Sequence, residues 1–260
     1  MLRLPAAVLL LCVGLVAADG AWAGSAERTE QLSAPLGSGG RLEVDNTIGS
    51  IRIEGADTEG VEITAHMKVS DSRSEAEAEE FLEQIEIRVE QTPGAVYVRT
   101  RVPGGFLDKI EDDYQIDYEI RVPRHVQIDA ELQVGNVRIV DVSGRVVVET
   151  HVGEIEVEVG SGAIEASTHV GNIEATLGHF DGEGRLRFET NVGNIELKLP
   201  ADLAVRLDAS VTIGDVDCDF DAESERNTWV GEKVSGDING GGPTLKARAN
   251  IGSVSLRRGR

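Results

Sequence analysis

The sequence has few cysteines, few aromatic residues and a shortage of positive charge. Cys12 and Cys218 are the two cysteines in 260 residues, which excludes a disulfide framework and a cysteine-based zinc site. Aromatic residues make up 4% of the chain, so we expect a thin core filled by Val, Ile, Leu and Ala. The formal net charge of −21 argues against nucleic acid and anionic membranes as ligands. A basic partner, a neutral glycan or a divalent cation is compatible with it.

Long hydrophobic runs are missing except at the N-terminus. Arg3 precedes an apolar run at 6–18, and Ala21-Trp22-Ala23 has the small-x-small pattern of a cleavage site. This arrangement is typical of a secretory signal peptide, and the run is too short to span a membrane. We therefore predict that residues 1–23 are removed and that the protein reaches the periplasm, the cell surface or the medium. Cys218 then remains alone, and its alternation with apolar neighbours indicates a small buried hydrophobe.

The sequence also lacks the motifs of common enzyme classes. It contains no nucleophile elbow, P-loop, zinc-protease helix or dinucleotide fingerprint. Asp215, Asp217, Asp219 and Asp221 alternate as in a calcium loop, but Ala222 stands where an EF-hand needs glycine, and no glutamate closes the loop. A strand with an acidic outer face explains this run better. We predict no catalytic residue and no cofactor.

What the chain does contain is a short glycine repeat. Gly135, Gly144, Gly153, Gly162 and Gly171 follow one another at nine-residue intervals, and apolar residues alternate between them. Alternation of this kind indicates strands with one buried face, and glycine allows the positive φ of a tight corner. The corners alternate between V-G-[N/E] and S-G-[R/A], so the full repeat comprises two strands. We predict an all-β, two-sheeted parallel β-solenoid with about 18–22 residues per coil.

The same pattern extends along most of the chain. We expect a single solenoid domain over 41–256, with residues 41–54 as its first coil, after a flexible lead-in at 24–40 and before a frayed basic tail at 257–260. The predicted structural turns are Gly49, Gly135, Gly144, Gly153, Gly162, Gly171, Gly193, Gly214 and Gly252.

An irregular insertion interrupts the repeat at 55–123. Its acidic segment at 74–84 predicts one short helix, with Asp71 or Ser72 as the N-cap. A hairpin is expected around the turn at 91–94.

One column of carboxylates is the weak candidate for a metal site. Glu156, Glu174, Glu196 and Asp217 each occupy the second position after a turn, and in-register coils would place them about 4.8 Å apart. Like charges at this spacing repel one another. Our hypothesis is that a divalent cation or a basic partner relieves the repulsion.

Two further groups of polar and aromatic residues stand out. His151 and His169 precede equivalent glycines and should stack on neighbouring coils, but other coils carry Gln133, Asn191, Thr212 and Asn250 there, which favours a generic polar shoulder over a metal site. Thr150, Thr168 and Thr190 should form a buried hydroxyl ladder. Weak candidates for binding a sugar or protein by aromatic contact are Trp229 and Tyr114.

The phrase at 118–123, YEIRVP, followed by the recurring VGNV, VGEI, VGNI, IGDV and SGDI, resembles the bacterial putative-adhesin family, a domain of unknown function. The resemblance covers residues 40–256. It implies a β-solenoid, an exported envelope location and an interaction or scaffold role, and it supplies no catalytic residues.

The leading interpretation is an exported, non-enzymatic envelope or secreted solenoid that binds a protein or glycan, as an adhesin-like module or scaffold. One alternative is a polysaccharide-active β-helix enzyme, which would need a carboxylate pair in a cleft and sugar-stacking aromatics. The other is a purely structural spacer. The ligand and the oligomeric state stay open at this point.

Overall fold

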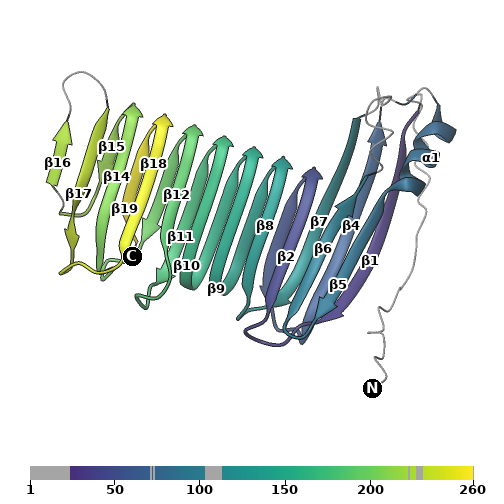
Figure 1. Cartoon of the computed structure of the whole chain (residues 1–260), viewed down its shortest axis with the longest axis horizontal. Helices are drawn as coiled ribbons and strands as arrows, with labels where there is room; N and C mark the ends of the chain where they lie inside the picture. Colours follow the sequence, from purple (N-terminus) through teal and green to yellow (C-terminus); the bar gives the residue numbers. More distant parts are fainter. Residues whose placement is uncertain are drawn as a thin grey trace.

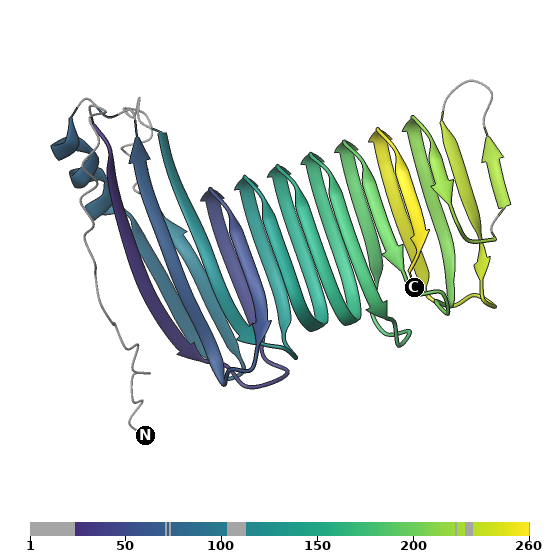
Figure 2. The same ribbon diagram turned by 180° about the vertical axis from the view of Figure 1, so that it is seen from behind.

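The computed structural model describes residues 24–70, 72, 74–102, 113–221, 223–226 and 231–259. Within these residues, nineteen strands and one helix form an elongated two-layered slab, and the apolar core lies between the layers (Figure 1, Figure 2). The expected signal peptide and Trp229 fall outside the described residues.

Two long strands show how the nine-residue repeat builds the slab. The strands β9 (Val137–Val152) and β10 (Ile155–Val170) each run through one layer, cross an S-G corner, and continue in the other layer. They pair in parallel, with Val137 opposite Ile155 and Val146 opposite Ile164. Alternate residues of both strands are buried. The predicted parallel solenoid with two strands per coil is therefore confirmed.

The remaining strands extend these two layers in both directions. The first layer consists, in spatial order, of β5 (Glu86–Thr92), β6 (Ala95–Arg101), β2 (Arg41–Ile48), β8 (Gln127–Val134), the second halves of β9 and β10, β12 (Leu186–Val192), β18 (Thr244–Ile251), β14 (Val205–Ile213), β17 (Glu232–Ile238) and β16 (Glu223–Arg226).

The second layer consists of β1 (Ala26–Pro35), β4 (Gly60–Ser70), β7 (Asp113–Pro123), β3 (Ile51–Ala56), the first halves of β9 and β10, β11 (Ile173–His179), β13 (Ile195–Leu199), β19 (Val254–Arg258) and β15 (Val216–Cys218). Pairing is parallel in the middle of both layers. It is antiparallel at both ends of the first layer and at the β1 end of the second, whereas β15 at the other end pairs in parallel with β19.

The order of coils in space differs from their order in the chain at both ends. The coil formed by β2 and β3 lies between β6–β7 and β8–β9, so residues 41–54, expected as the first coil, do not lie at the end of the slab. The C-terminal coil of β18 and β19 likewise lies between β12–β13 and β14–β15. Arg257 and Arg258 belong to β19 and are not a frayed tail. All coils have the same spacing between strands and bury the same side of each strand. A coil that comes later in the chain can therefore pair between two earlier ones.

The lead-in is also structured, contrary to the flexible segment expected at 24–40. Strand β1 pairs antiparallel with β4 along its whole length, from Ala26 opposite Val69 to Pro35 opposite Gly60. Leu32, Ala34 and Leu36 are buried in the core. Only these few residues alternate at the end of a polar stretch, so the strand pattern was short, and the pairing with β4 decides the conformation.

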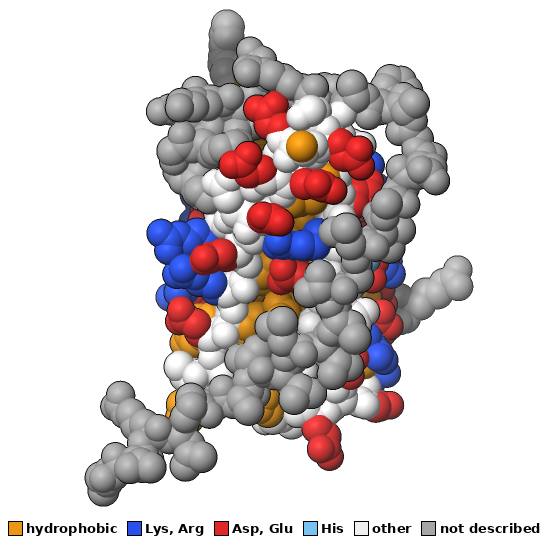
Figure 3. Space-filling view, turned by 90° about the vertical axis from the view of Figure 1, so that its right-hand side faces the viewer, with side chains coloured by type: hydrophobic (Ala, Val, Ile, Leu, Met, Phe, Trp, Pro, Cys, Tyr) orange, Lys and Arg blue, Asp and Glu red, His pale blue; other side chains and the backbone are white. Residues whose placement is uncertain are grey.

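The insertion contains the predicted hairpin and the predicted helix. β5 and β6 pair around the turn at 93–94, and α1 (Glu75–Gln84) buries Ala78, Phe81 and Leu82. Its N-cap is Ser74, whose hydroxyl accepts the amide of Glu77 at 3.2 Å, and not Asp71 or Ser72. Figure 3 looks onto this end of the slab, where Asp and Glu side chains gather and apolar side chains show between them.

The predicted inner ladder of threonines is present. Thr150, Thr168 and Thr190 are buried in successive coils. The Thr168 hydroxyl donates to the Gly153 carbonyl at 3.4 Å and the Thr190 hydroxyl to the Gly171 carbonyl at 3.1 Å. The Thr150 hydroxyl has no hydrogen-bond partner among the residues that the structure describes.

Candidate binding surface along the glycine corner

One edge of the slab is built from the corners that read [V/I]-G-x. Strands β2, β8, β12, β18 and β14 end along this edge (Figure 1), as do β9 and β10. Gly153 has φ of +145°, and a Cβ atom there would collide with the carbonyl oxygen of Gly135 in the preceding coil. Glycine is therefore required both by the backbone conformation and by the close stacking of coils. All nine predicted turn glycines have φ between +129° and +149°.

The residue after each corner glycine holds the coils in register. Asn136 Oδ1 accepts the amide of Glu154 in the next coil at 2.9 Å, and Asn172 Oδ1 accepts the amide of Asn194 at 2.9 Å. Asn194 Oδ1 accepts the amide of Ser253 at 3.0 Å. Because the asparagine side chain satisfies a backbone N–H that the turn leaves free, V-G-N recurs at this edge.

The residue before each corner glycine forms an exposed row that the sequence analysis missed. Six of these aliphatic side chains are 44% to 58% exposed, whereas the alternating apolar residues of the same strands are buried. Pairing places them in register from coil to coil. We call this row the aliphatic ridge; in spatial order it comprises Ile48, Val134, Val152, Val170, Val192, Ile251 and Ile213. The signal was present in the sequence, since each of these corners has Val or Ile directly before glycine.

A second polar ladder flanks the ridge on the first layer. The imidazole rings of His151 and His169 stack as expected, with centroids 4.5 Å apart and 21° between their planes. Asn250 Nδ2 donates to Asn191 Oδ1 at 3.0 Å. In the described part of the chain, no three His, Cys, Asp or Glu side chains come together as a metal site. These residues behave as the generic polar shoulder.

The carboxylate column on the second layer is only partly as predicted. Glu156, Glu174 and Glu196 are neighbours in register, but Ser255 of the inserted C-terminal coil separates Glu196 from Asp217. Among the described residues, no three His, Cys, Asp or Glu side chains of this column come together around one point.

Basic side chains of the chain itself relieve the repulsion in this column. Arg138 pairs with Glu156. Lys198 Nζ lies 2.6 Å from Glu174 Oε1 and 3.7 Å from Glu196 Oε1, and its hydrogen bond to Glu174 raises the pKa of the lysine. Arg257 pairs with Asp217 at 2.7 Å. The hypothesis that a cation or partner must neutralise the column is therefore not needed to explain it.

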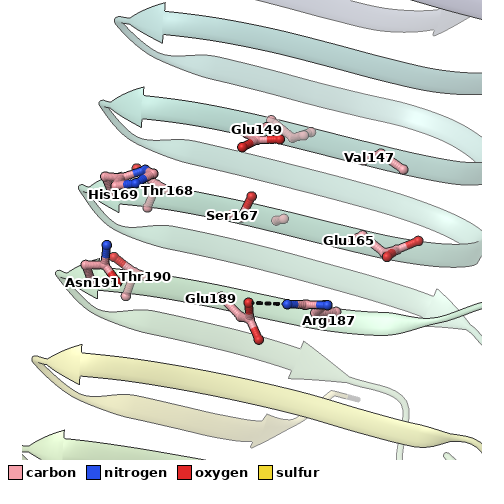
Figure 4. A pocket seen from close by; sticks show the side chains of 12 residues that line it. Val147, Glu149, Glu165, Ser167, Thr168, His169, Arg187, Glu189, Thr190 and Asn191 are labelled. Carbon is pink, nitrogen blue, oxygen red and sulfur yellow. Dashed lines mark hydrogen bonds and ion pairs between the residues drawn. The ribbon is translucent and has the colours of Figure 1, made fainter.

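A hollow on the outer face of the first layer has a volume of about 490 Å³. Its floor is Ser167, which lies between the longer side chains of Glu149 and Glu189 on the adjacent strands (Figure 4). Glu189 accepts from Arg187 Nη2 at 2.6 Å and lies 2.8 Å from Lys246 Nζ.

The electrostatics of this hollow differ from those of a glycosidase site. Burial alone would raise the pKa of Glu189, but the bonds from Arg187 and Lys246 hold it below its usual value. A carboxyl that protonates a glycosidic oxygen needs a raised pKa. Glu189 therefore does not have the raised pKa that such an acid needs.

The remaining candidates are structural. Tyr114 is buried, with its ring 5.7 Å from that of Phe81 in an edge-on contact, so it is not an exposed binding aromatic. Burial raises the pKa of the half-buried Cys218 thiol, which suits the predicted small hydrophobe. Asp219, one of the alternating aspartates, pairs with Arg257 at 3.2 Å.

Comparisons with known proteins support the architecture. The structure is similar to that of a putative cell adhesion protein of Clostridium sporogenes. The match covers 89% of this chain and 99% of that chain, with 13% identity and a TM-score of 0.51. A putative adhesin of Bacteroides fragilis covers 88% of this chain and 96% of its own, with 10% identity and a TM-score of 0.33. No curated protein matches the sequence, and no helix in the described residues is long and apolar enough to cross a membrane. The Toastrack DUF4097 family model matches residues 124–257, just over half of the chain, and the chain belongs to this family.

Proposed function

We propose that this protein is an exported, non-enzymatic module of the cell envelope that binds a protein or glycan, as an adhesin-like or scaffolding solenoid. The observation that carries the proposal is the aliphatic ridge, because the largest contiguous apolar patch on a folded protein is often a functional contact surface. The adhesin names of the structural neighbours agree with a binding role.

Three further observations support this proposal. The N-terminal 23 residues have the pattern of a signal peptide. Many charges on the two sheet faces pair within the chain, as in the contacts of Lys198 and Glu189. The ridge, in contrast, has no partner among the described residues that covers it, since six of its seven side chains are large exposed hydrophobics.

The proposal is tested by retention of envelope components on the immobilised mature protein. Native envelope fraction is passed over wild type, over the triple variant Val152→Thr/Val170→Thr/Val192→Thr, and over Glu156→Gln/Glu174→Gln on the adjacent face. We expect a component that wild type and the glutamine variant retain and the threonine variant loses. Threonine keeps the shape and strand propensity of valine, so loss reports on apolar contact. Equal retention by all three proteins contradicts binding through the ridge, and no retention by any of them contradicts the binding function and favours a spacer.

A further inference from the structure

We infer that the aliphatic ridge is the contact between two copies of this chain, which pair side by side with their long axes antiparallel and with Val170 at the two-fold axis. The inference rests on the proposed function and names the partner of that same surface. Val170 is the middle member of the ridge in spatial order.

The first argument is the amount of apolar surface. At 44% to 58% exposure for six side chains, the ridge leaves on the order of 400 Å² of aliphatic surface in water, comparable to the largest patch on a typical monomer. Seven rungs at about 4.8 Å, with the polar ladders on both sides, offer roughly 600 Å² per copy. Stable interfaces bury about 800 Å² per partner, so we expect a dimer of micromolar rather than nanomolar affinity.

The second argument is charge. Charged residues make up 27% of the chain, yet among the ridge residues and the residues that flank each corner only Glu154 and Asp215 are charged. Lys and Arg are absent from these positions, which disfavours an anionic lipid or polysaccharide, and two carboxylates offer little to a basic partner. A chain with a net charge of −21 can approach its own copy with least repulsion along this strip, which carries only these two charges.

The third argument is spacing. The ridge side chains repeat once per coil, so the gaps between them repeat at the same distance. The ridge of a second copy has the same repeat and can fit its side chains into these gaps along its whole length. A two-fold axis makes such a contact isologous, so that the same residues serve both copies. With Val170 on the axis, Val152 faces the other copy's Val192 and Val134 faces its Ile251.

The orientation follows from the acidic end. Helix α1 carries five glutamates and stands at the N-terminal end of the same edge (Figure 1). A parallel pair would place the two helices side by side, where their charges repel. In the antiparallel pair each α1 lies beside the opposite end of the other copy, formed by β14 and β17, where Arg206 and Lys233 pair with the acidic side chains of Asp237 and Asp208.

The first experiment measures association by sedimentation velocity on the mature protein from about 1 to 200 µM, a range that brackets micromolar affinity. We expect dimerisation of wild type. Val170→Glu should weaken it at least tenfold, because it buries two carboxylates at the axis. The matched control is Val147→Glu, on the outer face of β9 away from the corner, which should dimerise like wild type. Circular dichroism melts show that both variants fold. A wild type that stays monomeric, or equal effects of the two variants, overturns the inference.

The second experiment determines the orientation by disulfide trapping. Two single-cysteine variants, Val134→Cys and Ile251→Cys, are made in a Cys218→Ser background. Each is oxidised alone, and an equimolar mixture of the two is oxidised in parallel. We expect a crosslink in the mixture and little in either protein alone. Self-crosslinking of each protein without a mixed product overturns the antiparallel pairing.

The two proposals fail separately. If the protein is monomeric but the threonine variant still loses an envelope component, the inference of self-pairing is wrong and the binding function stands. If the dimer forms and no component is retained by wild type, self-pairing stands and binding to other envelope components is contradicted.

Discussion

The amide of Gly193 donates a hydrogen bond to the carbonyl oxygen of Ile251 at 2.9 Å, and the amide of Gly252 donates to the carbonyl oxygen of Ile213 at 3.0 Å. These bonds place the last coil of the chain between two coils that precede it in sequence. The C-terminal strands are thus internal to both layers, although solenoid coils usually follow one another in chain order.

Removing residues 244–259 should therefore cost more than the contacts of one coil. The deletion separates β12 from β14 and β13 from β15, so we expect the segment from β14 onwards to lose its ordered pairing. Native-state hydrogen exchange should show fast exchange throughout 205–238 in the truncated protein. Protection of β14 equal to wild type would contradict the inserted position of the last coil.

The corner glycines should tolerate side chains less well than a turn glycine with open space. Gly153 and Gly94 both have positive φ, but a Cβ on Gly153 meets the Gly135 carbonyl and one on Gly94 meets nothing. Gly94→Ala should cost about 1 kcal/mol from backbone strain alone, and Gly153→Ala about 3 kcal/mol or more. Glu158→Gln on an exposed face should stay within about 0.5 kcal/mol. Denaturant midpoints measure all three, and equal losses for the two glycine variants would mean that coil stacking is not the constraint.

Lys198 should reduce the repulsion between the carboxylates of Glu174 and Glu196 in the column. Lys198→Gln removes the cation that contacts both Glu174 and Glu196, and we expect a loss of at most about 1 kcal/mol, because the pair is exposed and screened. The loss should shrink as sodium chloride is added.

The wild-type melting temperature should respond alike to calcium chloride and to sodium chloride at equal ionic strength. A rise with calcium that saturates, and that sodium does not reproduce, would restore the cation hypothesis for the column.

Glu189 should make folding stability depend on acid pH. Its pKa in the folded protein is lowered: burial opposes ionisation, but the hydrogen bonds from Arg187 and Lys246 outweigh it. A lowered folded pKa adds stability above the unfolded-state value, near 4.3, and that stability is lost as the pH falls through the folded value. Urea unfolding from about pH 3 to 6 should show a flatter profile for Glu189→Gln than for wild type. Parallel profiles would show that the ion pairs do not form in solution.

The sequence by itself determined the repeat and its consequences. Nine-residue spacing of glycine and period-two alternation, as around Val146 and Val148, leave few folds other than a two-strand coil, because both are local properties of the backbone. The helix, the hairpin and the stacking of His151 on His169 followed from the same local signals and from the fixed coil length.

Only the tertiary structure decided which coils are neighbours and which surfaces stay open. A strand can pair with a free strand edge formed by any other part of the chain. The local sequence pattern therefore does not predict the insertion of β18 and β19 or the pairing of β1 with β4. That insertion removed Asp217 from the predicted column and placed Ile251 in the aliphatic ridge. The exposure of Val152 and Val170 also required the structure, because an apolar residue before a glycine corner reads as core until the direction of the turn is known.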